Sequence, residues 1–195
     1  MNRMNSVLLI ISGLLGFSGP VFAHTGVLPA DGIGYGFMHP FLGLDHTLVM
    51  LGVGLWAATQ RLAVAGQIVA VFLLSMLAGA LLGLQGVQFV YVETAILLSL
   101  LAIGGLLVMG RLRLPAAIAA ALVAGSALMH GLAHGSEIPT TASAYGYLLG
   151  MVAATAVLHL LGFSLGLLSN RGNAALLLRL YGGATALVGS WLFFS

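Results

Sequence analysis

The stretch HPFLGLDHTLVMLGVGLWAATQ (residues 39–60) places ionisable side chains directly before a long apolar run. His39, Asp45 and His46 lie in its first third, and no other charged or histidine side chain follows within it. A membrane-spanning helix needs about 20 consecutive, predominantly apolar residues. The stretch therefore predicts one such helix, with the ionisable groups in its outer turns.

The composition of the whole chain indicates a membrane protein. The 195 residues are 61% hydrophobic, have a mean hydropathy of +1.14 and include only 5% charged side chains, whereas a soluble domain contains about a quarter. No polar or proline-rich stretch is long enough to link two domains. Residues 24–195 are therefore expected to form one transmembrane domain.

Missing residue types exclude several classes of function. The chain has no cysteine, so neither disulfides nor thiolate metal sites can form. It has no lysine, so it contains no Walker-type phosphate loop, and ATP-driven chemistry within this polypeptide is excluded. The arginines occur singly or in one close pair and form no basic patch, which argues against nucleic-acid binding.

The first 23 residues have the pattern of a signal peptide. They combine one arginine, an apolar core from Val7 to Phe17, a Gly-Pro break, and Val21 and Ala23 in a small-x-small arrangement. Cleavage after Ala23 would make His24 the first residue of the mature protein. The alternative is an uncleaved first transmembrane helix, although the apolar core is short for one.

Six apolar segments follow, each about as long as a bilayer-spanning helix. They cover residues 40–60, 62–84, 90–110, 114–135, 144–168 and 174–194. The predicted fold is an all-α bundle of six transmembrane helices after a cleaved signal peptide.

The arginines predict the orientation of this bundle. An exported amino terminus starts the first helix outside, so the connections with Arg61, Arg111 and Arg113, and Arg171 lie in the cytoplasm. This arrangement agrees with the positive-inside rule. The protein is expected in the bacterial inner membrane, with the mature amino terminus and the carboxyl terminus in the periplasm.

The outer turns of the first predicted helix carry a candidate metal site. Pro40 suits the first turn of a helix, which makes His39 the expected cap. At about 100° per residue, His39 and His46 return to within about 20° of one face, and Met50 lies about 40° further round. Asp45 is expected on the adjoining flank.

A second cluster ends the fourth predicted helix in the sequence HGLAHGSE (residues 130–137). His130 and His134 are four residues apart and share a helix face, and Glu137 follows one turn later. Both clusters are expected to face the periplasm. The weaker candidates for metal ligands are His24, Met50, Glu93, Glu137 and His159.

Intramembrane ionisable groups are costly in hydrocarbon, so they usually face the bundle interior and mark an ion path. For both clusters metal binding is the favoured interpretation, and structural hydrogen bonding is the alternative. His159 could simply bond a neighbouring carbonyl, Met50 could fill the core, and the glutamates could be hydrated. Imidazole and carboxylate ligands suit Ni²⁺, Co²⁺ and Zn²⁺, whereas Mg²⁺ and Ca²⁺ prefer oxygen ligands.

The two motifs resemble those of the HupE/UreJ family of small bacterial nickel permeases. The pattern HPxxGxDHxxxM is matched by His39, Pro40, Gly43, Asp45, His46 and Met50. The pattern HGxAHGxE is matched by His130, Gly131, Ala133, His134, Gly135 and Glu137. The resemblance covers the whole chain. It implies import of nickel, with cobalt assigned to some members, and an indirect link to the maturation of hydrogenase or urease.

The expected activity is that of a secondary or channel-like importer with no permanently bound cofactor. Periplasmic Ni²⁺, or Co²⁺, would exchange water for protein ligands and pass inward. The expected ligands are His39, Asp45, His46, His130 and His134. Because imidazole ligands must be neutral, import is expected to fail as the periplasm is acidified through roughly pH 6. Glycines at four-residue spacing, such as Gly79 and Gly83, also leave a homo-oligomer open.

A zinc-dependent intramembrane hydrolase is the alternative function. Three histidines could hold Zn²⁺ while a carboxylate activates the water in the fourth position. An importer needs a polar path beyond the site, for which His159 in the middle of the membrane is the main candidate. A purely structural subunit would leave both histidine clusters without a purpose.

Overall fold

The computed structural model describes residues 32–110, 114–139, 142–169 and 174–194. Their regular structure is helical throughout, which confirms the predicted all-α class. The helices are α2 (Ile33–Leu42), α3 (Leu44–Ala57), α4 (Leu62–Leu84), α5 (Val92–Val108), α6 (Ala116–Ser136), α7 (Ala144–Ser169) and α8 (Ala174–Phe194). The predicted signal peptide and His24 lie outside the described residues.

The lengths of these helices agree with a multi-pass membrane protein. Helices α4, α6, α7 and α8 are each long and apolar enough to cross a membrane, and α2 with α3 would make a fifth, broken span. Helix α5 is apolar but has only 17 residues, at the lower end of the usual range for a spanning helix. The described residues thus confirm four or five candidate spans of the predicted six.

The prediction of one continuous helix over residues 40–60 is wrong. The helix begins at Ile33 and breaks at Gly43, so that α2 and α3 meet at an angle of 87°. Gly43 is extended, with φ −94° and ψ 118°. Pro40 lies inside α2, and His39 lies in its last turn instead of capping it. Proline lacks an amide donor and glycine is a poor helix former, so the pair weakens the helix here.

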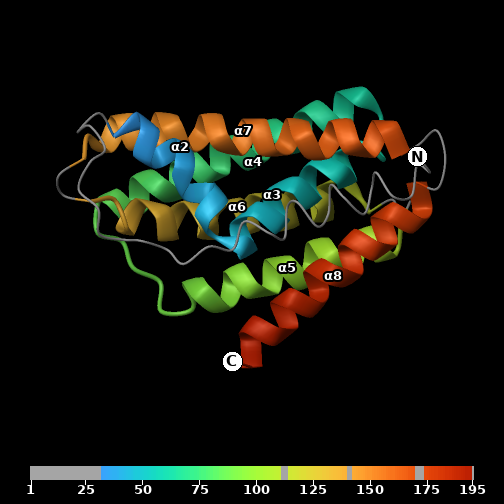
Figure 1. Ribbon diagram of the computed structural model, residues 1–195. Helices are drawn as coiled ribbons and strands as arrows, with labels where there is room; N and C mark the ends of the chain where they lie inside the picture. Colours follow the sequence, from blue (N-terminus) through green and yellow to red (C-terminus); the bar gives the residue numbers. More distant parts are fainter. Residues whose placement is uncertain (1–31, 111–113, 140–141, 170–173, 195) are drawn as a thin grey trace, which may run out of the picture.

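Helix α3 is the centre of the bundle. Every residue from Val49 to Ala58 is buried, as expected for a helix that is apolar on all sides. It contacts α4, α5, α7 and α8. In Figure 1, α7 lies along the top of the view, α5 and α8 lie together at the bottom, and α3 lies between them.

Helix α4 packs closely on α6, and α5 packs closely on α8. Both α2 and α3 pack on α7. Glycines allow the backbones to touch. A Cβ atom added at Gly79 of α4 would overlap the carbonyl oxygen of Leu128 in α6, and one added at Gly131 of α6 would overlap that of Met76 in α4. Small residues serve this purpose where lipid supplies no hydrophobic drive. Helix α6 is thereby held firmly against α4.

We expect Gly79→Ala to destabilise the bundle by about 1–3 kcal/mol, because the new methyl group overpacks the α4–α6 contact. Gly66→Ala in the same helix is the matched control, since no atom lies within 4 Å of its added Cβ. It should stabilise the protein by about 0.5–1 kcal/mol through helix propensity. Thermal unfolding in detergent, followed by circular dichroism, measures both. Equal stability of the two variants would contradict the close backbone contact.

Candidate metal-binding site

The bend between α2 and α3 brings the two halves of the first motif together. In a continuous helix the Pro40 carbonyl would accept a hydrogen bond from the amide four residues later. The break removes that donor, and the Thr47 hydroxyl donates to the Pro40 carbonyl instead, at 2.7 Å. The Thr47 amide donates to the Gly43 carbonyl at 3.0 Å. His39 and His46, on either side of the bend, consequently both contact α6.

Helix α6 supplies the second half of the cluster. His130 and His134 are both fully buried. The ring centroid of His134 lies 4.6 Å from that of His39 and 4.4 Å from that of His46. The ring centroid of His130 lies 4.9 Å from that of His46. Four imidazole rings from three helices therefore form one cluster.

Hydrogen bonds decide which ring nitrogens remain free. His46 Nδ1 donates to Asp45 Oδ1, and His130 Nδ1 donates to the Ser126 carbonyl oxygen, both at 2.8 Å. The other nitrogen of each neutral ring then carries a lone pair. Both of these Nε2 atoms, and both ring nitrogens of His134, are buried with no hydrogen-bond partner among the described residues. Buried polar atoms are nearly always paired, so this group has the chemistry of a metal site.

Glu137 joins the cluster at the carboxyl end of α6. Its Oε2 lies 3.4 Å from His39 Nε2, and the hydrogen bond with His39 lowers the pKa of Glu137 from its ordinary value of 4.5. The Glu137 side chain is 53% exposed, so the cluster opens to the surface here. His39, His134 and Glu137 each offer a ligand atom, and these three atoms lie within 4.8 Å of one another. They could hold a single metal ion.

The main predicted residues all lie in this cluster, but not on one helix face as expected. His39 and His46 belong to two helices and each contacts the ring of His134, so the prediction from a continuous helix is wrong. Asp45 bonds to the ring of His46, in the way that a carboxylate orients a metal-binding histidine. Glu137, a weaker candidate, lies directly beside His39 and His134. That these residues bind a metal stays a prediction.

The remaining candidates lie apart from the cluster. Glu93 is exposed in the first turn of α5, and none of the histidine contacts described above involves it. Met50 and His159 are buried deeper in the bundle. His159 Nδ1 donates to the Thr155 carbonyl oxygen at 2.8 Å, which is the structural role that the alternative interpretation foresaw.

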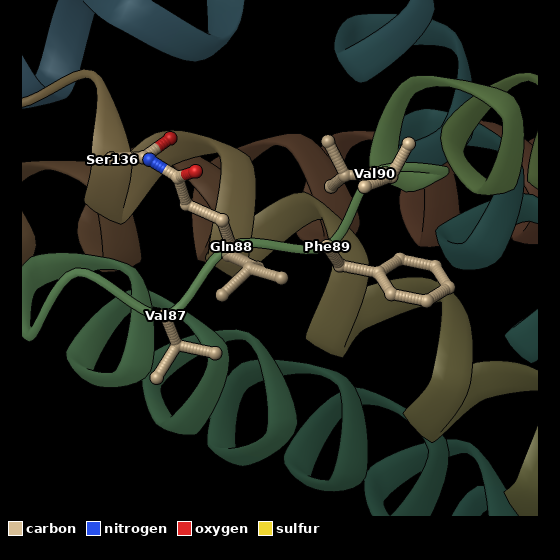
Figure 2. A pocket seen from close by; sticks show the side chains of 7 residues that line it. Val87, Gln88, Phe89, Val90 and Ser136 are labelled. Atoms are coloured by element: carbon tan, nitrogen blue, oxygen red, sulfur yellow. The ribbon is translucent and has the colours of Figure 1, made fainter.

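A pocket near the end of α6 offers no comparable chemistry. It has a volume of about 260 Å³ and lies between the connection from α4 to α5 and α6. Figure 2 shows the side chains that line it, with Val87, Gln88, Phe89, Val90 and Ser136 labelled. The lining is formed by Val87, Gln88, Phe89, Val90, Val92, Leu132 and Ser136. No imidazole or carboxylate lines it, so the candidate metal site is the packed histidine cluster.

Sequence reasoning missed the aromatic residues around the cluster. The ring centroid of Tyr147 lies 5.6 Å from that of His39. The ring centroid of Phe72 lies 6.4 Å from that of His130 and 4.6 Å from that of His159. Tyr147 could have been found from its place in the outer turn of the apolar segment 144–168, on the side of the membrane predicted for the histidine motifs. Phe72 carries no such signal, because the side chain of a phenylalanine in an apolar helix usually packs in the hydrophobic core.

Comparison with known proteins identifies the family. The family model described as HupE / UreJ protein matches residues 12–192. The chain belongs to the HupE/UreJ family. Protein HupE of Rhizobium leguminosarum bv. viciae is 42% identical over 174 residues, which cover 89% of this chain and 91% of that protein. No solved structure matches the chain.

Membership of the HupE/UreJ family confirms the resemblance seen in the two motifs. It makes the chain a membrane protein of a transporter family that is linked to nickel uptake. The family is not one of enzymes. The intramembrane hydrolase, considered as an alternative from the residue types, therefore has no support from the relatives.

We expect Gly43→Ala to weaken nickel binding by roughly tenfold or more, as loss of ligand orientation does in other metal sites. The added Cβ would lie 2.7 Å from His46 Nδ1 and 2.9 Å from Asp45 Oδ1, and would push this pair apart. The backbone angles of Gly43 suit alanine, so the effect is local. Calorimetric titration with Ni²⁺ measures it. Gly125→Ala, with no atom near its added Cβ, should bind as the wild type does, and equal binding by both variants would refute the steric argument.

Proposed function

We propose that the protein imports Ni²⁺, or alternatively Co²⁺, from the periplasm to the cytoplasm. The observation that carries this proposal is the group of buried imidazole nitrogens on His46, His130 and His134 that have no partner among the described residues, beside the carboxylate of Glu137. Nitrogen and carboxylate oxygen together suit borderline divalent ions. Membership of a family linked to nickel uptake favours Ni²⁺ among them.

The proposed topology has six spans in the bacterial inner membrane. Besides α4, α6, α7 and α8, these are the broken pair α2 and α3 and the short helix α5. The packing supports it: Gly79 and Gly83 of α4 lie against Leu128 and Leu132 of α6 in the same order, so these two helices run in parallel. A signal peptide cleaved after Ala23 would leave both termini in the periplasm, with the histidine cluster on that side.

The proposed entrance is the exposed edge of the cluster. Hydrated Ni²⁺ arrives at Glu137 and exchanges water for ligand atoms of Glu137, His39 and His134. Because the ring of His134 also lies beside that of His46, the ion can then exchange its outer ligands for His46 and His130. Conduction requires binding that is weak enough to release the ion. Ligands shared in this way suit a transient cargo, and the protein needs no resident metal cofactor.

The membrane potential is a sufficient driving force for this import. Moving a divalent cation down an inside-negative potential of about 100 mV releases about 4.6 kcal/mol. At about 1.4 kcal/mol per tenfold, this corresponds to roughly a thousandfold accumulation. No ATP is required. The imported metal would serve the maturation of a nickel enzyme such as hydrogenase or urease.

His134→Gln and Asp45→Asn should each lower the rate of nickel uptake by roughly tenfold or more, because one removes a ligand and the other removes its neighbour's orienting carboxylate. Uptake of radiolabelled nickel into proteoliposomes, normalised to inserted protein, measures this loss. Gln67→Ala, at an exposed position of α4, is the control that should transport at the wild-type rate. Wild-type uptake by both site variants would show that the cluster does not carry the ion.

Glu137 should contribute to nickel binding at neutral pH, because its pKa is lowered from the ordinary value of 4.5 and the carboxylate is ionised at every pH above that value. Glu137→Gln should therefore bind Ni²⁺ more weakly than the wild type at pH 7 and at pH 8, by roughly tenfold or more. Calorimetric titrations at the two pH values measure this loss. Equal affinity of the two proteins would contradict the assignment of Glu137 as a ligand.

A further inference from the structure

A second group of buried donor atoms lies deeper in the bundle, where α3, α4 and α7 meet. On α7, Thr155 lies about 80° and His159 about 120° round the helix from Tyr147, at about 100° per residue. All three are buried. At a rise of about 1.5 Å per residue, Thr155 lies about 12 Å and His159 about 18 Å along α7 from Tyr147, which contacts the outer cluster. These depths reach the middle of a bilayer core of about 30 Å.

Two methionine sulfur atoms converge on the hydroxyl of Thr155. Thr155 Oγ1 lies 3.4 Å from the Sδ of Met50 in α3 and 3.6 Å from the Sδ of Met76 in α4. Both methionines are fully buried. A hydroxyl carries one proton and can donate to only one of the two sulfurs at a time. Two thioether sulfur atoms from different helices thus lie close to the same hydroxyl. The sulfur that accepts no hydrogen bond keeps its lone pairs available.

His159 adds an unpaired nitrogen on the same helix. Its Nδ1 donates to the Thr155 carbonyl, and its Nε2 is buried with no partner in the described part of the chain. The ring of Phe72 contacts this ring and that of His130, the deepest histidine of the outer cluster. Phe72 therefore connects the outer cluster to the inner group.

We propose that Met50, Met76 and His159 form an inner metal-binding station, which receives the ion from the outer histidine cluster past Phe72. This inference rests on the proposed import function. Thioethers are soft ligands and imidazole is a borderline one, so the station accepts Ni²⁺ or Co²⁺ and rejects Mg²⁺ and Ca²⁺, which need oxygen ligands. Neutral thioethers hold a divalent ion less firmly than carboxylates do, which suits a station from which the ion must leave.

The direct test is the coordination shell of bound nickel. The full-length protein in nanodiscs is loaded with Ni²⁺ and studied by X-ray absorption at the nickel edge. Wild-type protein should show sulfur neighbours, and the double variant Met50→Leu with Met76→Leu should show none, since leucine keeps the apolar volume. Met129→Leu, at a partly buried methionine of α6, should keep the sulfur signal. Absence of sulfur in the wild type, or its persistence in the double variant, would overturn the station.

Transport gives the second readout. The double variant should lower the maximal rate of nickel uptake by roughly tenfold or more while KM changes by less than about twofold, because the outer cluster is intact. Met129→Leu should transport normally. If Asp45→Asn abolishes uptake while the double variant transports at the wild-type rate, import stands and the inner station is wrong. If proteoliposomes with the wild-type protein take up no more nickel than protein-free liposomes, the import function itself is wrong.

The chain offers one more specific probe, Ag⁺, which prefers soft ligands. The protein contains no cysteine, so inhibition by Ag⁺ cannot arise from thiolates. Ag⁺ should block nickel uptake by the wild type, and the half-inhibitory concentration should rise by roughly tenfold in the Met50→Leu and Met76→Leu double variant. An unchanged half-inhibitory concentration would contradict a paired thioether site.

Discussion

The hydrogen bond from the Thr47 hydroxyl to the Pro40 carbonyl holds the bend on which the candidate site depends. A backbone carbonyl in a membrane must find a partner within the protein, because lipid offers none. In a straight helix His39 and His46 would lie about 10 Å apart along the axis, too far for both rings to contact His134. The 87° bend brings both to that ring. The Thr47 hydroxyl thus satisfies the carbonyl that the bend leaves without its helical donor.

The histidine cluster by itself lowers the stability of the fold, and the packing of α3, α4 and α6 around it compensates. A buried polar atom without a partner costs about 1–3 kcal/mol, and within the described part of the chain the rings of His46, His130 and His134 contain several. The apolar burial of α3 and the backbone contact between α4 and α6 offset this cost. This packing of the helices keeps the lone pairs of the ring nitrogens together before any ion arrives. Little reorganisation is then needed when an ion binds, which favours fast exchange.

The change in ligand type along the proposed path has a physical logic. At the exposed edge, the carboxylate of Glu137 attracts a hydrated cation and can replace its water. On the proposed path, the imidazoles beneath it would accept a partly dehydrated ion, and the thioethers of Met50 and Met76, which both lie near the Thr155 hydroxyl, would hold it more weakly still. The negative charge of the proposed ligands is thus confined to the exposed edge. An ion driven by the membrane potential can follow such a path without being trapped.

The sequence by itself determined the class of protein, most helix boundaries and the residues of both motifs. Apolar length and four-residue spacing are local properties, so α4 matches its predicted bounds, and His130 and His134 both contact the ring of His46. Only the tertiary structure decided the break at Gly43, the place of Glu137 among the histidines, and the meeting of Met50, Met76 and Thr155. These features depend on hydrogen bonds and contacts between helices that are distant in sequence, and no local pattern encodes them.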